Sequence, residues 1–190
     1  METKNVMIVG VGGQGSLLAS RLMGAIAIAE GYDVKVSEVH GMSQRGGSVV
    51  TYVRFGEKVY SPVISDGEAD FIVSFERIEA ARYARCLKKD GKIIVNTQMI
   101  DPMPVIIGAA EYPVEVLEEL KGKGVSVDEM DALTLANEAG NVKSVNMVLM
   151  GRLARYFDID YDKWIEVMKT LVKPQFVDVN VKAFSLGYNS

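Results

Sequence analysis

The chain has 190 residues, of which 48% are hydrophobic, and it carries 21 Lys and Arg against 25 Asp and Glu. Folding of a chain this long buries roughly 70% of its unfolded surface, so we expect residues 1–190 to form a single domain. The acidic balance argues against nucleic acid as a partner, because binding to a phosphate backbone requires a basic surface. The only cysteine, Cys86, excludes an internal disulfide and any cluster or zinc site built from several thiolates of this chain.

The sequence contains no sign of a membrane segment or a secretory leader. No apolar run approaches the roughly 20 residues of a membrane span. The first residues lead directly into a strand-like pattern at 6–9, without a signal-peptide pattern. We therefore expect a cytoplasmic protein with no membrane partner.

The first half of the chain predicts a βα unit followed by a hairpin. A buried strand at 5–9, a helix at 16–30 and a second strand at 32–36 indicate two parallel strands joined by a right-handed crossover. Residues 48–55 and 58–61 then resemble the two strands of a hairpin that turns at Gly56 and Glu57, just before Pro62.

The second half returns to alternating strands and helices. Strands are predicted at 71–75, 92–96, 105–107 and 125–130, and helices at 76–87, 114–121, 132–139, 143–157, 162–171 and 176–188. The pattern predicts an α/β protein with a Rossmann-like, mostly parallel sheet, flanking helices and an inserted β-hairpin.

The first candidate site is the glycine turn after the first strand. The spacing of glycines in Gly10-Val11-Gly12-Gly13-Gln14-Gly15 fits the dinucleotide fingerprint, and free amides at the start of the following helix would attract an anion. Glu38, near the end of the second strand, matches the place of a ribose-binding acid. A nicotinamide or flavin enzyme is nevertheless disfavoured, because Gln14 inserts a large amide into the turn and Glu38 runs directly into a second glycine loop that a simple nucleotide site does not need.

That second loop is Glu38-Val39-His40-Gly41-Met42-Ser43-Gln44-Arg45-Gly46-Gly47. Its glycines permit close approach of the backbone to a ligand or partner, and the guanidinium of Arg45 suits phosphate or carboxylate. The candidate binding residues of the two loops are Gly10, Gly12, Gly13, Gln14, Gly15, Ser43, Gln44, Arg45, Gly46 and Gly47. The alternative interpretation is a glycine-rich turn with a solvated arginine.

Other chemistries lack support. The chain has neither a P-loop nor a Gly-x-Ser-x-Gly elbow. His40, the only histidine, could act as a general base oriented by Glu38, although a structural or interface role is favoured for a lone histidine beside an acid. No spaced cluster of ligands indicates a metal site.

The two glycine loops together closely resemble the gamma-type subunits or domains of 2-oxoacid:ferredoxin oxidoreductases. Three further motifs, Tyr60-Ser61-Pro62, Gly67-Glu68-Ala69-Asp70 and Ser74-Phe75-Glu76, resemble the form found as beta subunits of indolepyruvate ferredoxin oxidoreductases. The resemblance covers nearly the whole chain, but the stretch 99–130 matches no motif of the family.

The resemblance implies a subunit that is inert alone and takes part in the oxidative decarboxylation of indolepyruvate or another aryl 2-oxoacid. The products would be an aryl acetyl-CoA, carbon dioxide and reduced ferredoxin, with CoA as co-substrate. Thiamine diphosphate, Mg²⁺ and [4Fe-4S] clusters would belong to a larger partner subunit, and the sequence agrees, since it lacks a Gly-Asp-Gly…Asn-Asn thiamine motif and the cysteines of a cluster.

Under this hypothesis, the two glycine loops form one edge of a composite active site or of the CoA path. The competing interpretation is a Rossmann-like module that binds a nucleotide or scaffolds a complex without a catalytic role.

Overall fold

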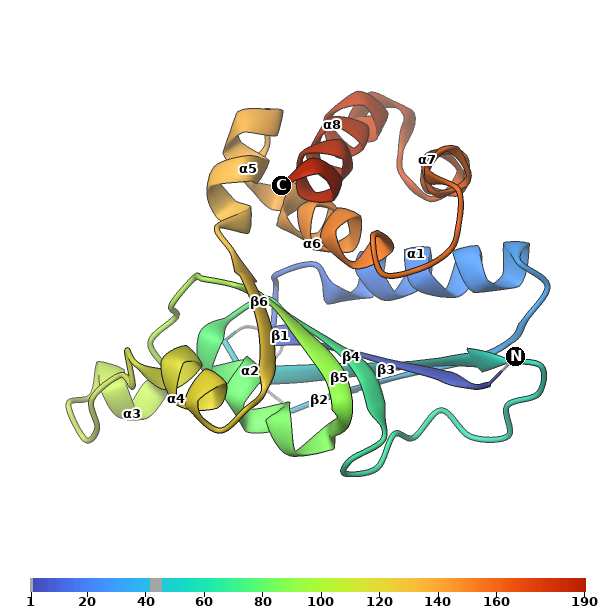
Figure 1. Ribbon diagram of the computed structural model, residues 1–190. Helices are drawn as coiled ribbons and strands as arrows, with labels where there is room; N and C mark the ends of the chain where they lie inside the picture. The colour runs from blue at the N-terminus through green and yellow to red at the C-terminus, as the bar shows by residue number, and fades with distance from the viewer. Residues whose placement is uncertain (1, 42–45) are drawn as a thin grey trace.

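A computed structural model describes residues 2–41 and 46–190 and contains a six-stranded sheet in the order β2-β3-β1-β4-β5-β6 (Figure 1). The strands are β1 (Lys4–Val11), β2 (Asp33–His40), β3 (Ser48–Gly56), β4 (Ala69–Ser74), β5 (Leu87–Asn96) and β6 (Ser126–Met130). β1, β4, β5 and β6 pair in parallel, whereas β3 lies antiparallel between β1 and β2. The predicted α/β class with a mostly parallel sheet is confirmed.

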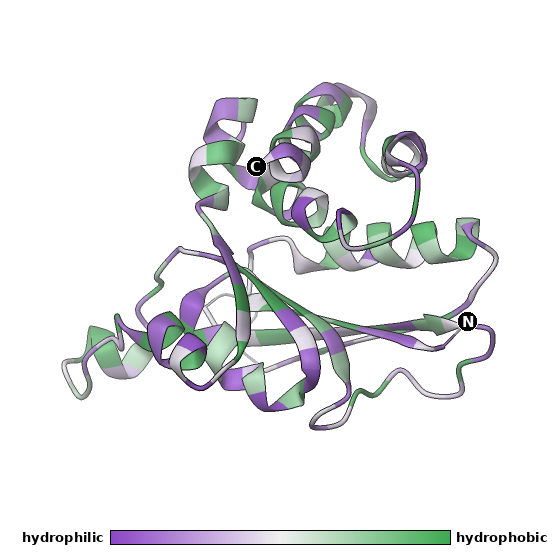
Figure 2. Ribbon diagram, in the orientation of Figure 1, coloured by the Kyte–Doolittle hydropathy of each residue, from purple (hydrophilic) through white to green (hydrophobic). Residues whose placement is uncertain are grey.

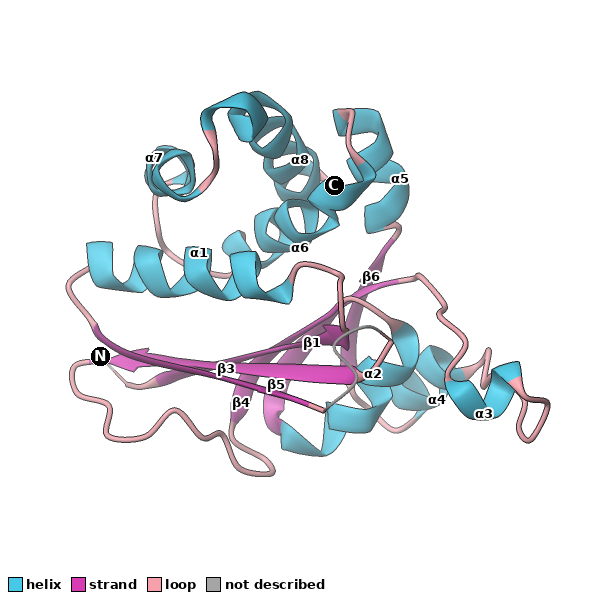
Figure 3. Ribbon diagram, turned by 180° about the vertical axis from the view of Figure 1, so that it is seen from behind, coloured by secondary structure: helices cyan, strands magenta, loops and turns pink. Residues whose placement is uncertain are grey.

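Helices cover both faces of this sheet (Figure 3). One face carries α1 and α6, with α5, α7 and α8 packed beyond them, and the other carries α2 and α4. The helices are α1 (Ser16–Ala29), α2 (Arg77–Tyr83), α3 (Met103–Ile106), α4 (Val116–Gly122), α5 (Ala132–Ala139), α6 (Val145–Ala154), α7 (Tyr161–Leu171) and α8 (Val177–Asn189), with 3₁₀ turns at Ala84–Cys86, Val142–Ser144 and Pro174–Phe176. In the described part of the chain, no helix combines the length and apolar character needed to cross a membrane.

The sequence of β1 explains why both faces are covered. Successive side chains of a strand point to opposite faces, and every residue from Val6 to Val9 is apolar and fully buried. Val6 and Ile8 belong to the core under α1 and α6, whereas Met7 and Val9 belong to the core under α2 and α4. A strand that is apolar on both sides must lie inside the sheet, which places the turn that follows it near the middle of the carboxyl edge of the sheet.

The first two strands are parallel, as predicted, but they are not neighbours. β1 and β2 both run antiparallel to β3, and therefore parallel to each other. The predicted hairpin between 48–55 and 58–61 is wrong, because 58–61 forms no strand. Both edges of β3 are already paired, and Asp33 holds this segment differently, by accepting a hydrogen bond from the amide of Val59 at 3.0 Å and pairing with Lys58 at 3.5 Å. The antiparallel hairpin is instead formed by β2 and β3.

The predicted strand at 105–107 is also wrong, because the chain forms the short helix α3 there. Pro102 precedes the helix and Pro104 lies in its first turn, where a proline ring fixes a helical φ and its missing N–H costs nothing. The same Pro104 could not donate a hydrogen bond to a sheet.

Two glycines allow α6 and α8 to cross at close range. A Cβ added at Gly151 would overlap the carbonyl oxygen of Phe184, and one added at Gly187 would overlap the carbonyl oxygen of Val148. Both obstacles are helix backbone and cannot rotate away, so the two helices could accommodate a larger residue only by moving apart.

We predict that Gly151→Ala lowers the free energy of unfolding by about 2 kcal/mol or more, because the methyl group overpacks this crossing. Gly24→Ala in α1 is the matched control, since a Cβ there would lie 3.5 Å from the Val36 side chain, an ordinary contact. The control should be neutral or stabilising by up to about 1 kcal/mol, from helix propensity. Urea denaturation of the two variants measures the difference, and equal stabilities would contradict the close crossing.

Candidate functional site

The glycine turn lies where the strand order reverses. After β1, the chain passes through α1 to β2, and then to β3, both of which lie on one side of β1 within the sheet. It then continues to β4, which lies on the other side of β1. In open α/β sheets, ligands bind outside the carboxyl ends of the strands at such a point. The predicted turn at 10–15 therefore occupies the usual place of a site in this class of fold.

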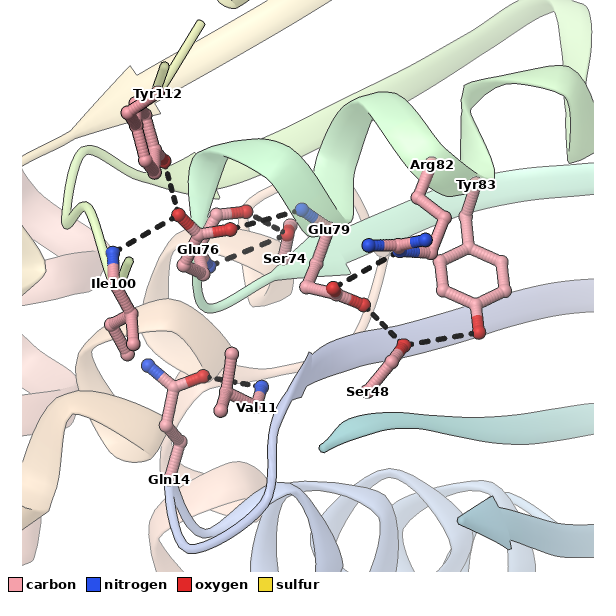
Figure 4. A network of polar contacts seen from close by, with 10 residues as sticks. All are labelled: Val11, Gln14, Ser48, Ser74, Glu76, Glu79, Arg82, Tyr83, Ile100 and Tyr112. Atoms are coloured by element: carbon pink, nitrogen blue, oxygen red, sulfur yellow. Dashed lines mark hydrogen bonds and ion pairs between the residues drawn. The ribbon is translucent and has the colours of Figure 1, made fainter. Parts of the chain in front are cut away.

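Gln14 folds back into the turn and holds it together. Its Oε1 accepts a hydrogen bond from the amide of Val11 at 2.7 Å (Figure 4), and its Nε2 donates to the carbonyl oxygen of Phe75 at 3.3 Å. A Cβ at Gly10 would lie 2.9 Å from Gln14 Oε1 and 3.0 Å from Phe75 Cβ. The large amide thus fits only because residue 10 is glycine, and it joins the turn to the end of β4.

The two glycine loops meet directly. The amide of Gly12 donates a hydrogen bond to the carbonyl oxygen of Gly47 at 2.8 Å. Gly13 and Gly15 have φ angles of 102° and 90°, and Gly46 has 80°, all in the left-handed region that favours glycine. The expectation that the loops share one edge is supported by this bond, whereas Ser43, Gln44 and Arg45 lie outside the described residues.

Beside this bond lies an open hollow of about 380 Å³. Among the described residues, the amides of Gly13, Gly15, Ser16 and Leu17 donate no hydrogen bond to other backbone groups, and the first turn of α1 carries no acidic residue. Free amides at the start of a helix favour an anion. The residues lining the hollow are Gly12, Gly13, Gly15, Ser16, Leu17, Glu38, His40 and Val49.

Glu38 and His40 both line this hollow, but each has a different hydrogen-bond partner. Glu38 accepts a hydrogen bond from the hydroxyl of Thr51 at 3.2 Å, and Nδ1 of His40 lies 3.0 Å from the carbonyl oxygen of Gly41. Both residues are exposed. The structure therefore brings the two predicted catalytic candidates to one place without the hydrogen bond by which Glu38 would orient His40.

The position of β3 weakens the dinucleotide interpretation further. In the dinucleotide fold, the strand that ends in the ribose-binding acid lies next to the first strand. Here β3 separates β2 from β1, and neighbouring strands are about 4.8 Å apart. Glu38 is consequently one strand farther from the glycine turn than the acid of a dinucleotide site.

A buried carboxylate, for which the sequence indicates no role, lies beside the glycine turn. Glu76 is 1% exposed and caps α2, since its Oε2 accepts a hydrogen bond from the amide of Glu79 at 3.0 Å. Its Oε1 accepts from the amide of Ile100 at 3.2 Å and from the hydroxyl of Tyr112 (Figure 4). Burial and the bond to Glu76 raise the pKa of Tyr112, so the phenol stays a donor. A single glutamate after a strand gives no sequence signal that it is buried. In the sequence, Glu76 stands out only as part of the family motif Ser74-Phe75-Glu76.

A second buried carboxylate holds the start of β3. Glu79, 5% exposed, accepts hydrogen bonds from the hydroxyl of Ser48 and from Nε of Arg82, the latter at 3.1 Å. The hydroxyl of Tyr83 lies 3.4 Å from that of Ser48 (Figure 4). Because Ser48 follows Gly47 directly, α2 fixes the position of the second glycine loop at its carboxyl end.

We predict that Glu76→Gln lowers the free energy of unfolding by roughly 2–4 kcal/mol, because the new NH₂ group would face buried donors and leave at least one unpaired. Glu115→Gln is the control, since Glu115 also precedes a helix but is exposed and caps no amide with its side chain. Denaturation of the isolated chain measures both. A Glu76→Gln variant as stable as the control would show that the buried contacts contribute little.

Comparison with known proteins places the chain in a protein family. Residues 5–190 match the family described as pyruvate ferredoxin/flavodoxin oxidoreductase. The chain is 47% identical to the indolepyruvate oxidoreductase subunit IorB of Thermococcus kodakarensis, over 98% of this chain and 95% of that one. It is 48% identical to the protein of the same name in Pyrococcus horikoshii, over the same shares of the two chains.

Solved structures share the fold. The pyruvate oxidoreductase subunit PORC of Thermotoga maritima superposes with a TM-score of 0.74 and 20% identity, covering 100% of this chain and 97% of that one. A 2-oxoglutarate:ferredoxin oxidoreductase of Magnetococcus marinus, solved with 2-oxoglutarate, coenzyme A and succinyl-CoA, superposes with a TM-score of 0.68 and 19% identity, and there the match covers 31% of a longer chain. Together, the matched residues and the relatives identify this chain as a member of the pyruvate ferredoxin/flavodoxin oxidoreductase family, as its motifs predicted.

Proposed function

We propose that this chain is the small, gamma-type subunit of an indolepyruvate:ferredoxin oxidoreductase, with residues 1–190 as one domain, acting in the cytoplasm. The observation that carries the proposal is the identity of 47–48% to two IorB subunits over 98% of the chain. The complete enzyme would release carbon dioxide from an aryl 2-oxoacid, transfer the acyl group to the thiol of CoA and deliver the electrons to ferredoxin.

The redox and thiamine chemistry would then belong to the partner subunit. A [4Fe-4S] cluster needs four thiolates as a rule, and this chain has one cysteine. Cys86 is buried, and burial raises the pKa of its thiol, which disfavours the thiolate a metal requires. The described residues contain no group of three or more His, Cys, Asp or Glu placed to hold a metal ion. These residues do not fit an iron-sulfur cluster, so this chain would not carry out a step that needs one.

The contribution of this chain would be the edge formed by the two glycine loops. The free amides at the start of α1 fit a phosphate group, of which CoA has several, or a carboxylate of the partner subunit. Glu38 also lines the hollow, and its carboxylate would repel an anion bound directly beside it. An anion would therefore lie at the α1 side of the hollow, with His40 and Glu38 across from it.

The free amides also favour a second candidate, a Rossmann-like module that binds a nucleotide or scaffolds a complex without a catalytic role. This alternative differs in a measurable way, because the isolated chain would bind a dinucleotide or nucleotide. Titration calorimetry with NAD, FAD and CoA on the chain alone distinguishes it.

We expect reduction of a viologen dye, dependent on indolepyruvate, CoA and thiamine diphosphate, only when this chain is co-expressed anaerobically with its large partner subunit. Each chain alone is the control. Full activity of the large chain alone, or two chains that do not associate, would refute the composite site and favour the scaffold interpretation.

The role of Arg45 stays a prediction from the sequence. If its guanidinium contacts CoA, Arg45→Ala in the assembled enzyme should raise the apparent KM for CoA about tenfold, with a smaller effect on the KM for the oxoacid. Arg85→Ala is the matched control, because Arg85 is exposed and pairs with Asp66 at the opposite end of the sheet. An unchanged KM for CoA together with loss of subunit association would assign Arg45 to the interface.

A further inference from the structure

The first part of the stretch 99–130, in which the sequence shows no motif of the family, forms an apolar arm, defined as residues 99–114. Its core, Met-Pro-Val-Ile-Ile-Gly-Ala-Ala at 103–110, contains eight consecutive residues without a charge. Met103 is 65% exposed, Ile106 65% and Ile107 68%, and no residue of α3 is buried. Figure 1 shows α3 projecting from the body beside α4, and Figure 2 shows its hydrophobic colouring. Contiguous exposed apolar surface of this kind marks an interaction site.

The arm is ordered by its own backbone rather than by packing. The amides of Val105 and Ile106 donate to the carbonyl oxygen of Pro102, and those of Ala109 and Ala110 donate to that of Pro104, at 2.8–3.1 Å. Gly108, with a φ of 73°, closes the turn after α3. A segment whose backbone is already folded loses little backbone entropy when a partner covers it.

Two neighbouring residues of the body clamp both ends of the arm. Oε1 of the buried Glu76 accepts hydrogen bonds from the amide of Ile100 at the beginning of the arm and from the hydroxyl of Tyr112 near its end. Arg77 donates to the carbonyl oxygen of Thr97, two residues before the arm, at 2.8 Å and to that of Val114, the last residue of the arm, at 3.4 Å. The direction in which the arm projects is therefore fixed from inside the molecule.

The arm is continuous with the glycine edge. Ile100 lines a hollow of about 460 Å³ together with Gly13 and Gln14, and the rim of this hollow includes the exposed side chains of Leu133 and Val142. A partner seated on the glycine loops would thus meet the base of the arm.

The charges around the arm select the kind of partner. Between Lys92 and Lys121 the sequence contains no Lys, Arg or His, but it contains Asp101, Glu111, Glu115, Glu118 and Glu119. Lys121 pairs with Glu118, and Arg77 places one positive charge at the base of the arm, so the acidic residues still outnumber the basic ones there. Two copies of the chain meeting arm to arm would bring these like charges together, which costs free energy. The complementary surface is an apolar groove with a basic rim, on a different chain.

We propose that residues 99–114 are the docking arm of this subunit and that they insert into an apolar, Lys- or Arg-rimmed groove of the large partner subunit. The inference rests on the proposed function, which supplies a partner of that kind. A stable interface buries about 800 Å² on each partner. A projecting arm can be covered by a partner on several sides, so it buries more surface than a flat stretch of the same number of residues. The adjoining glycine edge adds to this area.

The test compares two isoleucines of equal exposure. Ile106 in the arm and Ile28 on α1 are both 65% exposed, so Asp at either position should leave the fold intact, which circular dichroism and a thermal melt of each variant verify. In the anaerobically prepared complex, Ile106→Asp should weaken association of the two subunits at least tenfold, whereas Ile28→Asp should change it less than twofold. Mass photometry over a dilution series measures both dissociation constants.

A charge variant tests the rim separately. Glu111→Lys combined with Glu115→Lys should weaken the complex and reduce the dependence of its affinity on salt, because the attraction to a basic rim is lost. Unchanged or tighter association of the two subunits would refute the proposal that the groove has a basic rim.

The outcomes separate the two proposals. If the wild-type pair neither associates nor turns over indolepyruvate, the proposed function fails. If the wild-type pair is active and Ile106→Asp binds as tightly as Ile28→Asp, the function stands and the docking arm is refuted. If the isolated chain is a dimer that Ile106→Asp dissociates, the arm's occupant is a second copy and the proposal of a groove on the partner is overturned.

Discussion

The buried carboxylate of Glu76 is the contact on which the functional end of the molecule depends. A carboxylate out of water is costly unless its oxygens accept hydrogen bonds, and here Oε1 has two donors and Oε2 has one. These donors come from α2 and from both ends of the 99–114 arm. Next to Glu76, the carbonyl oxygen of Phe75 receives the amide of Gln14 and thereby joins the glycine turn to the same point. Glu76 thus fixes a helix start and a projecting segment, and its neighbour Phe75 joins the glycine turn to them.

The antiparallel strand β3 is the second constraint, because it changes what the glycine turn can do. By lying between β1 and β2, it moves Glu38 away from the turn and brings Gly47 to Gly12. A fingerprint that elsewhere cradles a pyrophosphate is here tied to a neighbouring loop through one of its own amides. The residues whose amides have no backbone acceptor in the described part of the chain line an open hollow, together with Glu38 and His40. Such an open site could be completed by another chain.

Much of the fold could be predicted because local signals agree with tertiary structure. Apolar runs bounded by glycine predicted the central strands. The predicted helix at 132–139 coincides with α5, which Asp131 caps and which ends at Gly140. The failures have physical causes. No strand forms at 58–61 because both edges of β3 are already paired. The apolar residues at 105–107 have a strand-like composition, but Pro102 and Pro104 start a helix there instead. Glu76 was missed as a buried group because neither periodicity nor spacing distinguishes a buried glutamate from a solvated one, whereas the glycine loops were found because they interrupt a strand-to-helix pattern at a fixed place.

The exposed arm also bears on how such a subunit must be made in the cell. A chain synthesised without its partner presents eight uncharged residues, held in place and accessible, to chaperones and proteases that recognise exposed apolar segments. Surplus copies would be removed or would aggregate, while copies that meet a partner early would be protected. Under the proposed docking, the surface that holds the two subunits together would also link the lifetime of each subunit to the supply of the other, which favours balanced synthesis of the two chains.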